Sequence, residues 1–173
     1  PEIITEIHEE YYRAGADIVS MNTFGVNRFK FKNISEIIKA AFNCADTARK
    51  KCSDLNKDLF IAYDMGSIGR MLKPLGDLDF EDAVSVFGEC AIEAERCGAD
   101  LIIIETMNDS YETKAALLAV KENTSLPVIV SNVYDETGKL MTGATPQVMV
   151  SIIEGMGADA VGINCSLGPR EML

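Results

Sequence analysis

Short apolar runs alternate with amphipathic segments along the whole chain, and this alternation constrains the fold more than any other feature. Five runs are nearly continuous in Val, Ile and Leu, as is typical of strands covered on both faces: residues 17–22, 59–64, 101–106, 127–132 and 160–164. The other segments have apolar residues at helical spacing, which predicts helices at 2–14, 34–53, 79–97, 109–123 and 146–156. This pattern predicts consecutive β-α units built on a parallel sheet.

A short motif recurs where predicted helices lead into predicted strands. AGADIV (14–19), CGADLI (97–102) and MGADAV (156–161) each place a glycine after a helix and an aspartate before a strand. Glycine readily adopts the left-handed conformation that ends a helix, so each copy is expected to be a helix-to-strand turn. No linker or low-complexity tract interrupts the chain, and we expect residues 1–173 to belong to a single domain.

Two helix starts carry capping residues. Asp109 is followed three residues later by Glu112, which is the spacing of a capping box. Thr145 precedes Pro146, so we expect Thr145 to cap the helix and Pro146 to occupy its first position, where a missing N–H costs nothing. His8 is assigned to the polar side of the first helix and is expected at the surface.

Alternating β-α units suit either a doubly wound sheet or a (β/α)8 TIM-type barrel. The first turns lack the G-x-G-x-x-G of a dinucleotide fold, which favours the barrel. In a barrel the carboxyl ends of all strands converge on one mouth, where barrel enzymes place their chemistry. Here those ends carry Asn22, Thr23, Asp64, Glu105, Thr106, Asn132, Asn164 and Cys165.

The net charge of −11 comes from 16 basic and 27 acidic residues. Without a Lys/Arg cluster or a Trp, it argues against nucleic acid as a partner. No apolar run approaches the roughly 20 residues that cross a bilayer, so no membrane partner is expected. The chain opens without Met, in helix-like sequence that does not have the form of a signal peptide, and we expect a piece of a longer polypeptide.

Five cysteines, an odd number without a C-x-x-C pair, argue for a reducing, cytoplasmic location rather than a disulfide framework. Cys44, Cys52, Cys90 and Cys97 fall near the apolar faces of predicted helices and are expected to be buried as small hydrophobic residues. Cys165 differs because it stands where an apolar strand ends and a Gly-Pro turn begins.

Four stretches carry a family resemblance, in the family's order and over most of the chain. They are GADIVSMNTFGVNRFKF (15–31), DMGSIGRMLKPLGDLDFEDA (64–83), GADLIIIETMNDSYETKAALLAVKEN (98–123) and GADAVGINCSLGP (157–169). With them the chain resembles the homocysteine S-methyltransferases, most closely the N-terminal homocysteine-binding module of cobalamin-dependent methionine synthases. The resemblance implies about five of a barrel's eight β-α units: the first, Asp-Gly-rich strand and the C-terminal units are absent.

The resemblance also implies a site. Cys165, in the GINCSLGP segment, matches one of the family's three thiolate ligands to zinc; the other two form an adjacent Cys-Cys pair, which this sequence does not contain. Glu105 matches the residue assigned to the amino group of homocysteine, and Thr106 and Asn164 adjoin these positions and could orient the substrate. Catalytic zinc keeps an open position, in which a bound homocysteine thiol would be held as the nucleophilic thiolate.

In the intact enzyme the resemblance implies that this thiolate accepts a methyl group from methylcobalamin to give methionine. Cobalamin and methyltetrahydrofolate would bind other modules, so the partner of the barrel is the cobalamin-binding module of the same polypeptide. We expect the isolated chain to be inactive. Three alternatives stay open: a cobalamin-independent enzyme using betaine or S-methylmethionine, a metal-free lyase or aldolase with Glu105 and Asp64 as acid and base, and a non-catalytic fragment.

Three loops are expected to surround the pocket. Residues 22–25 and 66–69 are expected to shape the rim, and the latter lacks the Lys-Ser/Thr of a phosphate-binding loop. Residues 134–143 should form a hairpin-like loop that turns at Thr137-Gly138. Asn132 does not match the residue expected at its strand end.

Overall fold

The computed structural model describes residues 1–172 and contains a single parallel sheet with helices between its strands. The strands are β1 (Ile18–Ser20), β2 (Phe60–Met65), β3 (Leu101–Met107), β4 (Val128–Asn132) and β5 (Ala160–Ile163). The helices are α1 (Glu2–Arg13), α2 (Ile34–Lys51), α3 (Phe80–Cys97), α4 (Ser110–Asn123) and α5 (Pro146–Gly155), with a short 3₁₀ helix at Ser53–Leu55. Every predicted element is present, with ends within two residues of the prediction.

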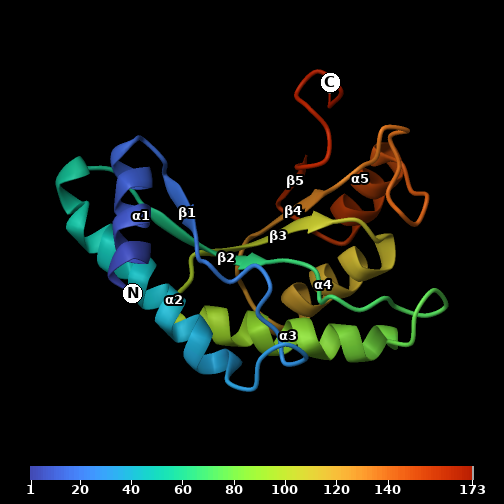
Figure 1. Cartoon of the computed structure of the whole chain (residues 1–173), viewed down its shortest axis with the longest axis horizontal. Coiled ribbons are helices and arrows are strands. Elements are labelled where there is room, and N and C mark those ends of the chain that lie inside the picture. Colours follow the sequence, from blue (N-terminus) through green and yellow to red (C-terminus); the bar gives the residue numbers. More distant parts are fainter. Residues whose placement is uncertain (173) are drawn as a thin grey trace.

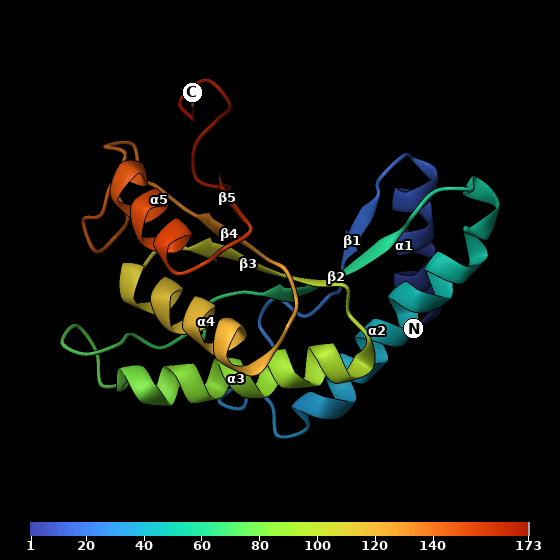
Figure 2. The same cartoon turned by 180° about the vertical axis from the view of Figure 1, so that it is seen from behind.

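The strands lie in the order β1-β2-β3-β4-β5, each parallel to the next. A doubly wound sheet would reverse its strand order partway, whereas a barrel adds strands in sequence. The five helices cover one side of the curved sheet and leave the other side free of helices (Figures 1 and 2). The arrangement confirms the predicted fold class, as an open part of a (β/α)8 barrel.

The alternation of side chains along each strand gives the two faces of the sheet different roles. In β3, Ile102 and Ile104 are completely buried under the helices, while Ile103 and Glu105 on the concave face are half-buried. In β2, Tyr63 packs toward the helices. Asp64 and Ala62, two residues apart, both lie on the concave face. The core therefore lies between sheet and helices, and polar strand ends face the hollow.

The predicted helix-to-strand turns are confirmed. Gly15, Gly98 and Gly157 have φ values of 114°, 102° and 87°, which is the left-handed region that favours glycine. The capping predictions are only partly right. Asp109 accepts a hydrogen bond from the Tyr111 N–H at 2.7 Å, but Glu112 makes its contacts elsewhere.

Pro146 begins α5 as predicted, and Thr145 occupies the N-cap position without a side-chain hydrogen bond to the helix. The hairpin-like loop is present: the Asp135 N–H donates to the Lys139 carbonyl at 2.9 Å, and Gly138 turns the chain at φ 71°. The carboxylate of Asp135 accepts from the N–H and hydroxyl of Thr137, which fixes that turn.

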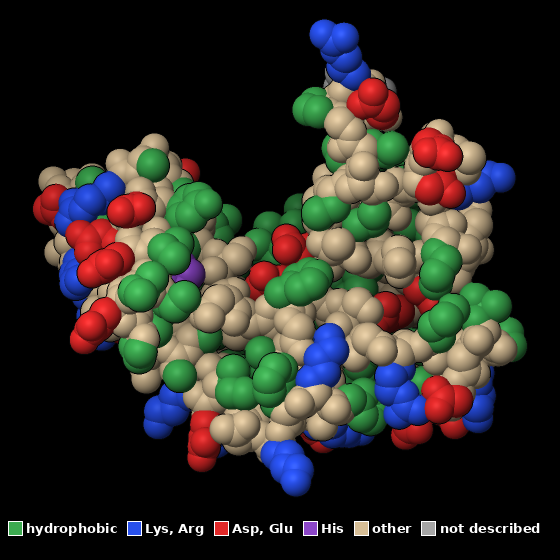
Figure 3. Space-filling view, viewed as in Figure 1, with side chains coloured by type: hydrophobic (Ala, Val, Ile, Leu, Met, Phe, Trp, Pro, Cys, Tyr) green, Lys and Arg blue, Asp and Glu red, His purple; other side chains and the backbone are tan. Residues whose placement is uncertain are grey.

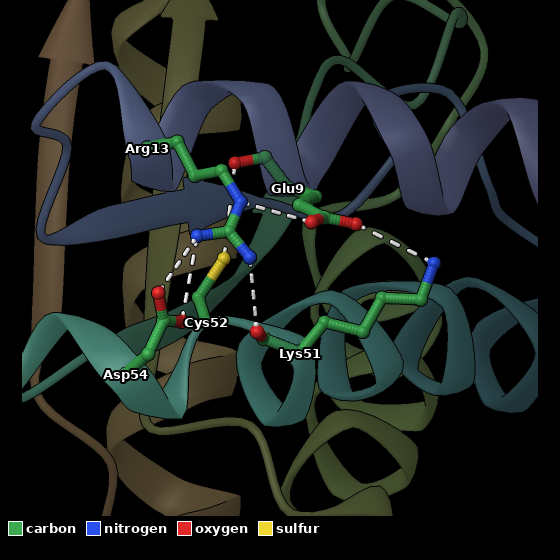
Figure 4. Close-up of polar contacts among 5 residues, drawn as sticks. All are labelled: Glu9, Arg13, Lys51, Cys52 and Asp54. Carbon is green, nitrogen blue, oxygen red and sulfur yellow. Dashed lines mark hydrogen bonds and ion pairs between the residues drawn. The ribbon is translucent and has the colours of Figure 1, made fainter.

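A cluster of polar contacts ties α1 to the end of α2 (Figure 4). Arg13 pairs with Glu9 at 2.9 Å and with Asp54 at 3.1 Å, and it donates to the carbonyl of Lys51 at 3.1 Å. The Cys52 thiol lies beneath these contacts, 3.8 Å from the carbonyl of Glu9. Because α1 leads directly into β1, this clamp fixes the position of the first edge of the sheet.

The expectation that His8 lies at the surface is wrong. Only 6% of His8 is exposed, and it forms a buried stripe on α1 with Thr5 and Tyr12. These three residues have the i, i+3, i+7 spacing of one helix face, which the polar character of two of them concealed. Burial lowers the pKa of His8, so its imidazole is neutral at pH 7.

All five cysteines are free. Cys44, Cys52 and Cys90 are buried as predicted, Cys97 is half-buried and Cys165 is exposed. Burial raises the pKa of Cys90 to about 11, which keeps its thiol protonated and inert. Among residues 1–172, no helix has the length and apolarity needed to span a bilayer.

Candidate functional site

The ends of β3 and β5 are joined through one side chain, Asn164. Its Oδ1 accepts a hydrogen bond from the Thr106 backbone N–H at 3.1 Å, and its Nδ2 donates to the Thr106 hydroxyl at 2.7 Å. Ser131, from the intervening strand β4, donates its hydroxyl to the same Oδ1 at 2.7 Å. Residues from three consecutive strands therefore meet at the mouth, as strand-end positions predict for a barrel.

These contacts orient the Asn164 amide and place its NH₂ group beside Cys165. The backbone N–H of Thr106 can only donate, so the atom facing it must be the amide oxygen. The amide nitrogen then points at the Cys165 sulfur, 3.3 Å away, while the Thr106 hydroxyl lies 3.9 Å from that sulfur. The amide nitrogen therefore lies within hydrogen-bonding distance of the sulfur.

A bulge in β3 turns two consecutive side chains toward the mouth. Ile104 pairs with Val130 and Met107 pairs with Asn132, so three steps along β3 match two along β4. The additional residue lets Glu105 and Thr106 both lie half-buried at the mouth, while Met107 returns to full burial. Strict alternation would have sent Thr106 under the helices.

Backbone strain is concentrated at the same place. Four non-glycine residues among 1–172 have positive φ, and three of them are Thr106 (61°), Cys165 (59°) and Ser166 (62°). A β-branched residue in this region is a genuine outlier. Such conformations persist only where the surroundings fix them, and they cluster at functional sites.

Two carboxylates lie on the concave face of neighbouring strands. Asp64 pairs in register with Ile103, which puts Glu105 two residues farther along β3 on the same face. Asp64 is 9% exposed, and its Oδ1 has no hydrogen-bond partner within residues 1–172. Burial, followed by the negative charge of Glu105, raises the pKa of Asp64 to about 7.

Asn132 does not line the mouth. Its side chain is 1% exposed and donates to the Met107 carbonyl at 3.0 Å and to the Thr113 hydroxyl at 2.9 Å, on the helix side of the sheet. Ser131 takes the place facing the site. The sequence assigned neither Ser131 nor Asp64 to substrate or metal. Asp64 could have been found because it ends an apolar strand, whereas Ser131 lies inside one.

The two predicted rim loops pack on each other. Thr23 donates its hydroxyl to the Asp64 carbonyl at 2.8 Å, and the Gly66 N–H donates to the Phe24 carbonyl at 2.9 Å.

Glu112, at the start of α4, accepts from the Ile68 N–H at 2.7 Å and from the Ser67 hydroxyl at 3.0 Å. Burial raises the pKa of Glu112, and these donors partly oppose the rise.

Residues 1–172 do not by themselves form a zinc site. Structural and catalytic zinc sites use three or four protein ligands. Within residues 1–172, no group of three or more His, Cys, Asp and Glu side chains is arranged to hold a metal ion. Cys165 stands at the mouth as one exposed thiol, with hydroxyl and amide groups as its neighbours.

A family model described as homocysteine S-methyltransferase matches residues 1–173. The methionine synthases of Mycobacterium leprae (strain TN) and Mycobacterium tuberculosis (strain ATCC 25618 / H37Rv) are each 30% identical over 182 residues, covering 99% of this chain. The chain spans only 15% of the length of either relative.

Among solved structures, the homocysteine methyltransferase MmuM from Escherichia coli superposes in its metallated form with a TM-score of 0.86 and 21% identity. This match covers 99% of the present chain and 65% of that protein. At this level of identity the likeness establishes the shared fold.

Proposed function

Because the chain belongs to the homocysteine S-methyltransferase family, we propose that it binds homocysteine as part of a methyltransferase that forms methionine. The observation that carries the proposal is the convergence of Thr106, Asn164 and Cys165 through hydrogen bonds at the mouth, beside Glu105. The family resemblance assigns Cys165 to the metal and Glu105 to the substrate, and Thr106 and Asn164 adjoin these two positions.

Each side chain has a distinct part in the proposal. Glu105 supplies the carboxylate that binds the ammonium group of the amino acid, since a carboxylate at the mouth is costly without a cationic partner. Asn164 holds Thr106 and Cys165 in a fixed geometry, which is needed because small displacements of reacting groups cost large factors in rate. Thr106 and Asn164 orient the bound substrate.

We assign Cys165 as one thiolate ligand of a zinc ion whose other protein ligands lie outside residues 1–172. Within residues 1–172, Cys165 is the one exposed cysteine and no metal-holding group of side chains forms around it, so we derive no step through zinc. Support for the assignment comes from the position of Cys165 in GINCSLGP and from its fixed surroundings. Elsewhere in the polypeptide, a Cys-Cys pair would complete the set.

The methyl donor in the proposal is methylcobalamin carried by another module of the same polypeptide, with methyltetrahydrofolate bound elsewhere. The methionine synthase relatives support this choice, since the chain matches only a small part of their length and leaves space for further modules. We propose residues 1–173 as the central part of one barrel domain, with β1 and β5 continued by further strands. The free cysteines support a cytoplasmic location.

A metal-free lyase or aldolase is a second candidate because Asp64 and Glu105 lie on the same concave face and the pKa of Asp64 is raised. Perturbed pKa values are common among acid-base residues. An assay of the natural protein that carries this chain distinguishes the methyltransferase from the lyase. The assay measures methionine formation from L-homocysteine and a methyl donor. Activity that a chelator removes and zinc restores supports the methyltransferase. Chelator-resistant cleavage of a carbon–carbon bond, without methionine formation, would favour the lyase.

A further inference from the structure

Asp64 lacks the partners that a buried carboxylate normally has. It is nine-tenths buried on β2, and its Oδ1 accepts no hydrogen bond from residues 1–172. Neither Asp64 nor Glu105 forms an ion pair with a Lys, Arg or His of the described chain. A buried charge of this kind is retained only when something else compensates it.

Asp64 lines a cavity rather than packed protein. The cavity has a volume of about 470 Å³ and lies between α1, β1 and the end of β2. Figure 3 shows the hollow of the molecule, with acidic side chains at its floor and a histidine at its wall. Asp64 is therefore part of the wall of a space that a bound group can enter.

The groups that face Asp64 leave its charge uncompensated. From α1, the cavity is bordered by His8, which burial keeps neutral at pH 7, and by Ile4, Ile7 and Tyr11. β1 and the following loop contribute no charged side chain: their lining residues are Ile18, Val19, Ser20, Met21 and Asn22. The second carboxylate, Glu105, is not part of the cavity lining but lies on the same concave face, on the neighbouring strand β3. Two carboxylates on one concave face without a cation are complementary to a positively charged ligand group.

We propose that Asp64 is a second carboxylate for the substrate's ammonium group, and that it exchanges its proton for that ammonium on binding. The inference rests on the proposed function, which supplies an amino acid as the ligand. In the empty site below about pH 7, Asp64 carries a proton, which removes the repulsion from Glu105. When R–NH₃⁺ enters, the carboxylic acid loses its proton to solvent and the pair becomes two carboxylates around one ammonium.

The raised pKa of Asp64 agrees with this exchange, since it leaves the group about half protonated near neutrality. Below pH 7 the proton competes with the ammonium, whereas above pH 8 the competition ends. Affinity for the ammonium group should therefore rise about tenfold between pH 6 and pH 8. The ammonium of an amino acid stays charged over this range, so the change reports on the protein.

The test compares two probes on the natural protein that carries this chain. L-homocysteine and 4-sulfanylbutanoate share the thiol and the carboxylate and differ only in the ammonium group, so the ratio of their dissociation constants isolates its contribution. Calorimetry at pH 6, 7 and 8 should give a ratio that increases about tenfold in favour of homocysteine. In Asp64→Asn the ratio should be smaller and independent of pH.

Asp58→Asn is the matched control, because Asp58 is exposed and precedes β2 at the opposite end of the strand. It should reproduce the wild-type ratio. A wild-type ratio that does not change with pH, or an Asp64→Asn ratio equal to that of wild type, overturns the inference while leaving the proposed function intact. Failure of the wild-type protein to bind either probe overturns both.

Discussion

Asn164 and Thr106, 58 positions apart in the sequence, exchange two hydrogen bonds at the mouth of the sheet: N–H to Oδ1 at 3.1 Å and Nδ2–H to Oγ1 at 2.7 Å. The exchange fixes both the positive φ of Thr106 and the direction of the Asn164 amide toward Cys165. Through this pair, the positions of the residues assigned to substrate and metal depend on one another.

Replacing Glu105 should separate substrate binding from metal binding. Glu105→Gln removes the negative charge but keeps the size, so homocysteine binding should weaken by roughly ten- to a hundredfold, the value of a hydrogen bond to a charged group. Zinc content of the natural protein should not change, because Glu105 is not assigned to the metal. Titration with homocysteine and elemental analysis measure the two quantities.

Glu122→Gln on the exposed face of α4 is the control for loss of one negative charge. Its affinity for homocysteine should equal that of wild type. An unchanged affinity in Glu105→Gln would remove Glu105 from the amino-group role.

Replacing Asp64 should change the pH dependence of stability. Its pKa is raised on folding, so the folded protein holds a proton that the unfolded chain releases, and stability falls as pH rises from about 4 toward 7. Asp64→Asn removes the ionisable group and with it this pH-dependent decrease in stability. The variant should be more stable than wild type above pH 7, by on the order of 1–3 kcal/mol, with the difference vanishing near pH 4.

Thermal unfolding of the barrel, followed by circular dichroism from pH 4 to pH 8.5, measures this difference. Asp58→Asn should show no such trend. A destabilisation by Asp64→Asn that grows with pH would mean that the ionised carboxylate has a stabilising partner.

A methyl group at Gly66 should disturb the rim. A Cβ there would lie 2.3 Å from the Phe24 carbonyl oxygen and 2.6 Å from its ring, so the two rim loops would have to separate. Gly66→Ala should cost about 1–3 kcal/mol. Gly155→Ala, whose Cβ would meet nothing within 4 Å at the end of α5, is the control and should be neutral or slightly stabilising. Equal melting temperatures for the two variants would contradict the packing described.

The chain of 173 residues, expressed alone, should associate and bind no zinc. Its edge strands β1 and β5 have no neighbour on one side, and every residue of β5 is exposed. Unpaired strand edges promote association between chains. Light scattering should show assemblies, elemental analysis should give background zinc, and no methyl transfer should occur. A soluble monomer with one zinc per chain would contradict this expectation.

Much of the fold could be predicted from local signals. The apolar runs and the three glycine turns placed every strand and helix, because buried strands and left-handed helix ends have strong residue preferences. The convergence of Thr106, Asn164 and Cys165 followed from the rule that parallel strands end on one side of a barrel.

The remaining features depend on tertiary contacts. The bulge at Thr106 is set by its bonds to Asn164, and Glu112 leaves its capping position because the 66–69 loop offers it donors. Asn132 turns under the helices because Thr113 accepts from it there. Such choices depend on residues 19 to 58 positions away, which local propensity does not describe.

The most direct test of the account is Cys165→Ser in the natural protein that carries this chain. Serine keeps the size and the neighbours of the side chain but is a poor zinc ligand, since zinc in such sites is held by thiolates. Elemental analysis and methionine formation should be measured on the same preparation. We expect zinc and methyl transfer to be lost together, and retention of stoichiometric zinc with normal turnover would contradict the assignment of Cys165.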